Sequence, residues 1–224
     1  MLESQLSSER QQLQLCRILY LDEDLVAVYK PAGLLSHPSA DPERPDLVSW
    51  LRARIEAEKL VMHHRLDLET SGLLVLTRSQ RACAPLAQAF EQRRIEKTYM
   101  AMVKGQPPAR GRIDLPLLEI RGRVKADPAG KAALTEFQRS QQKGGYALLQ
   151  LTPRHGRKHQ LRVHCLSRGW PIVGDALYGG EASSRMWLHA WRLSLQHPVS
   201  GQALELRCPS PEKWGLFGRV LAGE

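Results

Sequence analysis

The most informative stretch of this chain is HRLDLETSGLLVL, residues 64–76. Its last four residues form an apolar run typical of a buried β-strand, which starts directly after the turn Thr70-Ser71-Gly72. The acid Asp67 stands before that turn and just behind the pair His64-Arg65. This order predicts a carboxylate held rigidly at the edge of a sheet, beside cations, where it can act on a substrate.

Outward from this strand, the sequence is a series of short β-type and helical patterns. Two β-rich runs around the acidic link Asp22-Glu23-Asp24 predict a hairpin, and two later runs meet at the turn residues 197–201. The predicted strands are 18–21, 25–29, 73–77, 97–103, 146–151, 186–195 and 203–207. Strands outnumber helices and several neighbours are hairpin-linked, which favours a mixed α/β (α+β) fold with a largely antiparallel central sheet flanked by helices.

Helical patterns fill several of the intervals between these strands. The expected helices are 46–55, 79–92, 158–168 and a last one beginning at 210–211. Asp46 is the N-cap of the first, Gly169 ends the third, and Pro85 either kinks the second or marks its real start. Residues 105–131, rich in Pro, Gly and Arg, predict an irregular surface segment or a widely looped hairpin.

The 224 residues suffice for one sizeable core, although length alone also permits two small domains. With no repeat and no clear linker, we expect a flexible extension over 1–15 and one catalytic domain over 16–224. No apolar run approaches the roughly 18–20 residues of a membrane-spanning helix, and residues 1–14 are polar and Gln-rich, without a signal core. The expected location is therefore the cytoplasm, and nothing demands more than a monomer.

The charge balance favours a polyanionic partner. The chain has 32 Lys and Arg against 23 Asp and Glu, a net charge of +9. Such a charge attracts phosphates and releases their counterions, although many basic proteins never touch nucleic acid. Only a cluster of cations on one face would be decisive.

Cysteine and histidine usage gives no sign of a metal centre. Four cysteines lie far apart with no C-x-x-C pair, which is typical of reduced thiols. His159, His164 and Cys165 lie close in sequence, but their spacing fits no zinc-ligand pattern and no second cysteine pair completes a site. We expect no bound metal.

Five segments resemble, in order, the motifs of RluA-type RNA pseudouridine synthases, and together they span roughly residues 18–208. They are LVAVYKPAGLLS at 25–36, HRLDLETSG at 64–72, KTY at 97–99, GRKHQLRVH at 156–164 and PIVGD at 171–175. The resemblance implies an isomerase with an RNA-binding cleft that converts uridine to pseudouridine. This reaction needs neither redox change nor external energy, so no cofactor is expected, and the chain has no Walker loop and no G-x-G-x-x-G.

The resemblance also assigns catalytic roles. Asp67 matches the family's essential Asp, a covalent nucleophile on the ribose or the base, and the sequence does not choose between them. Arg162 is its expected partner, 95 positions away (162 − 67), because only Arg offers a planar two-pronged fork. Tyr99 matches an aromatic residue whose ring stacks on uracil, a contact worth about 1–3 kcal/mol. Its hydroxyl is a further candidate for assisting a proton transfer.

Further residues are expected to bind the substrate RNA. Arg65 either touches the backbone or fills the gap left by the extruded base, and His64 is interpreted as a hydrogen-bonding scaffold residue. The other candidates are cations: Arg154, Arg157 and Lys158 form a predicted phosphate-binding rim, and a second candidate group is Arg93, Arg94 and Lys97.

Plainer interpretations remain open for each residue. Asp67 could only cap its turn, Arg162 could be a solvated helix charge, and Tyr99 could belong to the core. A non-catalytic RNA-binding or RNA-folding protein is the alternative function, although binding alone needs no carboxylate facing a polyanion. Zinc-dependent base deamination lacks the H-x-E and P-C-x-x-C signature. About 17 residues precede the first strand, too few for an added RNA-binding domain, so we expect a compact family member acting on tRNA or ribosomal RNA.

Overall fold

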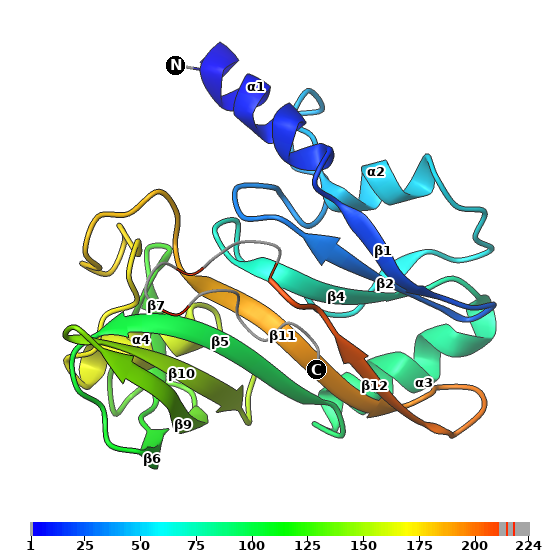
Figure 1. Ribbon diagram of the computed structural model, residues 1–224. Coiled ribbons are helices and arrows are strands. Elements are labelled where there is room, and N and C mark those ends of the chain that lie inside the picture. The colour runs from blue at the N-terminus through cyan, green and yellow to red at the C-terminus, as the bar shows by residue number, and fades with distance from the viewer. Residues whose placement is uncertain (1, 211–213, 215–216, 218–224) are drawn as a thin grey trace. The chain divides into compact units, whose positions relative to one another are not determined.

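The computed structural model describes residues 2–210 together with Trp214 and Phe217 (Figure 1). Its contacts divide the chain into two compact units. The first unit comprises Met1–Ile95 and Arg192–Cys208, and the second comprises Glu96–Trp191 and Pro209–Glu224. Strand β11 (Leu188–Gln196) runs from the second unit into the first, so the first unit is built from two separate stretches of chain.

The first unit contains antiparallel strands and three helices (Figure 1). Its elements, besides the end of β11, are α1 (Leu2–Leu13), β1 (Arg17–Leu21), β2 (Leu25–Lys30), α2 (Leu47–Arg52), β3 (Val61–Met62), β4 (Ser71–Thr77), α3 (Gln80–Glu91) and β12 (Ala203–Arg207). Strand β2 pairs with β1 and β4, β3 pairs with β4, and β12 pairs with β11. Every residue of β2 and β4 is buried, which explains why both strands read as continuous apolar runs rather than alternating ones.

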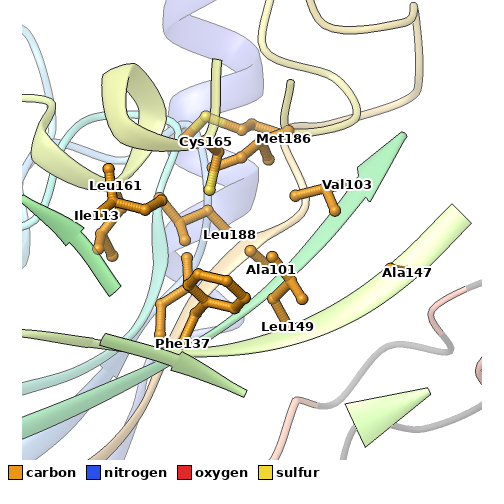
Figure 2. Packing of buried hydrophobic residues seen from close by; sticks show 12 residues of the cluster. Ala101, Val103, Ile113, Phe137, Ala147, Leu149, Leu161, Cys165, Met186 and Leu188 are labelled. Carbon is orange, nitrogen blue, oxygen red and sulfur yellow. The ribbon is translucent and has the colours of Figure 1, made fainter. Parts of the chain in front are cut away.

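The second unit contains a four-stranded antiparallel arrangement in the order β5, β10, β9, β6. Its elements, besides the start of β11, are β5 (Glu96–Lys104), β6 (Arg110–Asp114), β7 (Leu117–Ile120), β8 (Arg123–Ala126), β9 (Leu134–Lys143), β10 (Tyr146–Pro153) and α4 (Gln160–Ser167). Figure 2 shows its core, in which Leu161 and Cys165 of α4 pack among strand residues such as Phe137, Leu149 and Leu188. This packing fixes α4, the helix that carries Arg162.

The predicted fold class is confirmed. Eight strand pairs of the described residues are antiparallel, and helices accompany the strands: the pairs are β1–β2, β2–β4, β3–β4, β5–β10, β9–β10, β6–β9, β7–β8 and β11–β12. The hairpin around Asp22-Glu23-Asp24 forms as β1 and β2, and the pairing of β11 with β12 was also predicted correctly. The predicted RNA-binding cleft and the domain boundary at residue 16 stay predictions.

Residues 105–131 are more regular than the sequence suggested. They contain β6 and the hairpin of β7 and β8, which turns in two residues rather than through a wide loop. The turn residues Arg121 and Gly122 have φ values of +49° and +82°. A tight two-residue hairpin turn of this kind requires positive φ at both residues. Arginine is not a residue type from which such a turn is predicted.

The ends of the predicted helices need small corrections. Helix α2 begins after the predicted N-cap, since Asp46 accepts a bond from Ser49 N (2.9 Å), but it ends at Arg52 rather than at Ile55. Helix α4 starts at Gln160 rather than at 158, because His159 has a φ of +52° that a helix cannot contain. Pro85 lies inside α3. The predicted helix after Ser210 falls on residues that are mostly outside the described set.

The start of the chain is helical where a flexible extension was expected. Residues 2–13 form α1, and Glu9 of this helix is buried and paired with Arg44 of the same unit. A buried carboxylate needs such a partner, which explains why the helix is held against the unit. No helix in the described part of the chain is long and apolar enough to cross a membrane.

Candidate active site

Asp67 lies in the loop before β4, and the backbone on both sides of it is tied to the segment 30–36. The carbonyl of Leu66 accepts a hydrogen bond from Ser36 Oγ at 3.0 Å. The carbonyl of Leu68 accepts one from Gly33 N at 2.9 Å. Because both neighbours of the acid are held, the partly buried Asp67 has a fixed main-chain position.

Lys30 strengthens this arrangement from inside the first unit. Its side chain is fully buried, and Nζ donates to the carbonyls of Pro31 (2.9 Å), Leu34 (2.8 Å) and Leu68 (3.0 Å). A buried ammonium needs several acceptors, and here one of them belongs to the residue that follows Asp67. The end of β2, the turn after it and the loop of the acid are therefore joined by one cation.

The turn after Asp67 is closed by the main chain. Thr70 N donates to the carbonyl of Asp67 at 3.0 Å, so the acid's own carbonyl closes the turn. Gly72, the second residue of β4, has a φ of +118°, which only glycine adopts easily. The Thr-Ser-Gly sequence thus sets the path of the chain from the acid into the buried strand.

His64 supports β4 from the same loop. Its Nε2 accepts a hydrogen bond from Val75 N at 3.0 Å, and its ring stacks on Phe90 with centroids 4.6 Å apart. These contacts agree with the scaffold interpretation of His64, while its part in substrate binding stays a prediction. Arg65 is exposed, as a residue that is to meet RNA must be.

In the second unit, Arg162 is buried and forms a two-pronged ion pair with Asp175. Nε lies 2.8 Å from Oδ2 and Nη2 lies 2.6 Å from Oδ1, and the two side chains are 7% and 1% exposed. The plain interpretation of Arg162 as a solvated helix charge is therefore wrong. The sequence missed Asp175 as its partner, although this acid ends the matched segment PIVGD.

An aromatic side chain also contacts the guanidinium of Arg162. Its Cζ lies 5.0 Å from the ring centroid of Tyr178, within the range of a cation–π contact. The Tyr178 hydroxyl accepts a bond from Val124 N (3.1 Å) and lies 2.8 Å from Nδ1 of His159. Arg162 therefore has contacts both in the plane of its guanidinium and on its face.

Tyr99 and Lys97 stand on β5 two residues apart and so on the same face of the strand. Tyr99 is partly buried and packs against the core of the second unit. Burial lowers the pKa of the Lys97 ammonium, whose Nζ would lie 3.5 Å from a Cβ added to Gly156. Lys97 thus lies beside Gly156, the first residue of the matched segment GRKHQLRVH, as a common role of the two segments in binding RNA would require.

The three cations of the predicted rim all have protein partners. Arg154 is paired with Glu136, and Lys158 Nζ lies 2.6 Å from Glu119 Oε1. Arg157 donates through Nε to a main-chain carbonyl at 3.2 Å. Phosphate binding by this rim stays a prediction, and any phosphate would have to compete with these acids.

Among the described residues there is no group of three or more His, Cys, Asp and Glu side chains placed to hold a metal ion. The four cysteines are free thiols. Burial raises the pKa of the Cys165 thiol to about 12, so it stays protonated at neutral pH.

Residues 24–167, a range that contains Asp67, Tyr99 and Arg162, match the family model for RNA pseudouridylate synthase. The chain belongs to this family. Its predicted RluA-type membership and its class, isomerase, are thereby confirmed at the level of the family. Asp175 lies outside the matched range, although it ends the segment PIVGD that resembles a motif of the family.

Named pseudouridine synthases are similar to most of the chain. An uncharacterized RNA pseudouridine synthase of Chloroflexus aurantiacus is 40% identical over 86% of this chain, which corresponds to 65% of that protein. The dual-specificity RNA pseudouridine synthase RluA of Escherichia coli K12 is 38% identical, with 86% of this chain and 92% of that protein covered. Among solved structures, human RNA pseudouridylate synthase domain containing 4 has a TM-score of 0.74 at 25% identity, over 95% of this chain and 94% of that chain.

Proposed function

We propose that this chain isomerises uridine to pseudouridine in RNA and that Asp67 is the nucleophile. The observation that carries the proposal is the fixed backbone of Asp67. Both neighbouring carbonyls are bonded to the segment 30–36, in a motif that matches the family's catalytic one. A fixed position speeds the reaction of a nucleophile, because a reacting group already held in one geometry does not pay the entropy cost of being positioned during the reaction.

The chemistry explains why a carboxylate is useful. The bond between N1 of uracil and C1′ of ribose breaks, the base turns, and C5 joins C1′. The hydrogen of C5 leaves as a proton and N1 gains one, so atoms and electrons balance without an oxidant or reductant. Asp67 would form a temporary ester with ribose C1′ or add to the base. In either case the new bond to the Asp67 oxygen later breaks, and the carboxylate is the leaving group.

Arg162 and Tyr99 are proposed to serve the same reaction. The ion pair with Asp175 engages two of the five N–H donors of the Arg162 guanidinium. The sequence-based pairing of Arg162 with Asp67 stays a prediction, as does stacking of uracil on Tyr99. Both roles are supported by the positions of these residues in matched motifs, and by the buried, oriented state of Arg162.

The proposed substrates are tRNA, ribosomal RNA or both. The net charge of +9 suits a polyanion. The relative from Escherichia coli is named a dual-specificity enzyme, and this chain covers 92% of it. A cytoplasmic location and a monomeric state remain predictions. Carbodiimide-stop sequencing of total RNA from cells with and without the gene would identify the modified uridines.

The decisive variant is Asp67→Asn, which keeps the shape of the side chain and removes the charge. RNA labelled with tritium at uridine C5, isolated from cells lacking the gene, releases tritium when C5 joins ribose. We expect wild-type protein to release it and Asp67→Asn to be slower by about 10³-fold or more. RNA affinity, measured by filter binding, should change by less than about threefold, since a carboxylate does not attract a phosphate.

Glu69→Gln is the matched control, because this acid is exposed and lies two residues further along the same loop. It should keep the wild-type rate. If Asp67→Asn also keeps that rate, the nucleophile assignment is wrong. If wild-type protein binds the RNA and releases no tritium from any fraction, the non-catalytic RNA-binding function is the better one.

A further inference from the structure

The ion pair of Arg162 and Asp175 is unusually well enclosed. The two side chains are 7% and 1% exposed, and both oxygens of the acid face the guanidinium. Removing two charges from water costs about as much as their mutual attraction returns, so such a pair contributes little net stability. What a two-pronged pair does provide is a single orientation of the guanidinium plane.

Tyr178 fixes the remaining freedom of that plane. Its ring lies against the guanidinium face, with 5.0 Å from Cζ to the ring centroid. Tyr178 N also donates to Asp175 Oδ1 at 3.2 Å, so the ring and the acid belong to one tight turn. The orientation of Arg162 is thus set by two side chains whose own positions are coupled.

The turn that carries both residues has little room to change. Gly174 has a φ of +80°, and a Cβ there would lie 1.8 Å from the carbonyl oxygen of Arg185. A Cβ on Gly180 would lie 2.0 Å from the carbonyl oxygen of Ile172. Close backbone contacts at both ends therefore hold the turn in place.

The other end of Tyr178 is held by a strained residue. His159 adopts a left-handed conformation, φ +52°, directly before α4, and its Nδ1 lies 2.8 Å from the Tyr178 hydroxyl. Such a conformation is costly for a residue other than glycine and persists where the surroundings enforce it. Here it joins the start of the helix of Arg162 to the ring that covers Arg162.

We propose that Asp175 and Tyr178 are positioning residues for pseudouridine formation, which act by holding Arg162 in one orientation. This inference rests on the proposed function of Arg162. Neither residue needs to touch the substrate. Their effect on the reaction passes through the guanidinium, and this dependence can be measured.

The test is a double-mutant cycle on tritium release under single-turnover conditions, with the same C5-labelled RNA. We expect Asp175→Asn and Arg162→Lys each to slow the reaction by about 10²-fold. Independent effects would multiply to about 10⁴-fold in the double variant. If Asp175 acts through Arg162, the double variant will instead be within about threefold of Arg162→Lys alone.

Conservative variants and matched controls accompany the cycle. Asp175→Glu keeps the charge and should recover at least about tenfold of the rate lost in Asp175→Asn. Tyr178→Phe keeps the ring and loses the hydroxyl, so it should slow the reaction by less than Asp175→Asn. Asp127→Asn and Tyr146→Phe, which alter an acid and a tyrosine of the same unit outside the site, should leave the rate unchanged.

The outcomes separate this proposal from the function on which it rests. Multiplicative losses in the double variant, or no recovery in Asp175→Glu, overturn the positioning role while wild-type activity stands. An unchanged rate in Arg162→Lys overturns the role of Arg162 and the positioning role together. RNA affinity within about threefold of wild type in Asp175→Asn, together with an unchanged far-UV circular dichroism spectrum, supports the proposal, since unfolding would abolish both.

Discussion

Lys30 shows how one buried charge can organise the loop that carries the proposed nucleophile. Its Nζ donates hydrogen bonds to the carbonyls of Pro31, Leu34 and Leu68, and Leu68 directly follows the proposed nucleophile. Methionine at this position would fill a similar volume but donate no hydrogen bond. Buried carbonyls that lose their donor each cost about 1–3 kcal/mol. We expect Lys30→Met to lower the free energy of unfolding by about 3 kcal/mol, measured by urea denaturation.

The same variant should slow tritium release, because the loop of Asp67 loses one of its three ties to the segment 30–36. Lys104→Met is the control: this lysine is exposed and paired with Glu181, and exposed pairs of this kind contribute little to stability. Equal stability losses in the two variants would contradict the special role of the buried ammonium.

Among individual residues, the sequence pointed to Asp67 as the candidate nucleophile, which stays a prediction, and it missed the acid that pairs with Arg162. Asp67 stands out because it follows a His-Arg pair and precedes a turn and a buried strand. Asp175 does not stand out, because a lone acid after an apolar run is also a common turn residue. Its ion pair with Arg162 depends on how the turn 174–180 folds back, which no local pattern encodes.

At the scale of elements, Asp24 joins the link between β1 and β2 to the start of α3. Its carboxylate accepts bonds from Arg81 Nε (2.8 Å) and Ser79 Oγ (2.6 Å), and Ser79 is the N-cap of α3. The hydrogen bond and charge of Arg81 lower the pKa of Asp24 most, burial opposes this, and Ser79 lowers it further. The charged form of Asp24 therefore stabilises the fold.

The pH dependence follows from this direction. A carboxyl whose folded pKa lies below its unfolded value of 3.8 contributes stability above pH 3.8 and loses it as pH falls through the folded pKa. We expect Asp24→Asn to cost about 1 kcal/mol at pH 7, allowing for the solvent exposure of Arg81. The difference from wild type should shrink as pH falls below 3.8 in urea titrations. A constant difference across that range would show that the charge of Asp24 is not involved.

Elements with strong apolar patterns were predicted well, and those without them were not. The fully buried β2 and β4 stand out as continuous runs of apolar residues. The β7–β8 hairpin has no such run, and its turn places Arg121 at a positive φ where Asn or Gly would be the usual signal. The early start predicted for α4 failed for a related reason, since the left-handed His159 is enforced by tertiary contacts.

At the scale of the whole molecule, the excess of cations should govern RNA affinity. Lys158 is already paired with Glu119, so its attraction for phosphate is reduced in the free protein. We expect Lys158→Gln to weaken RNA binding and to lower the salt slope of log K by about 0.7–0.9, the value for one lost phosphate contact. Glu119→Gln should strengthen binding, because it removes a competing anion.

Filter binding over a series of potassium chloride concentrations measures both effects. Lys104→Gln is the control, because Lys104 is a cation of the same unit that is also paired with an acid but lies outside the segment 156–164. It should leave the salt slope within error of wild type. Equal slopes for Lys158→Gln and wild type would remove Lys158 from the predicted rim.

The division of the first unit into two stretches of chain has a consequence during protein synthesis. Its core takes residues from both stretches, with Leu25 and Leu73 from the early one and Leu193 and Leu206 from the late one. A nascent polypeptide that emerges from the ribosome therefore exposes the apolar strands around Leu25 and Leu73 until residues 192–208 have also been translated. The segment that carries the proposed nucleophile acquires its final support last, so a prematurely terminated chain carries the acid without the framework that makes it an enzyme.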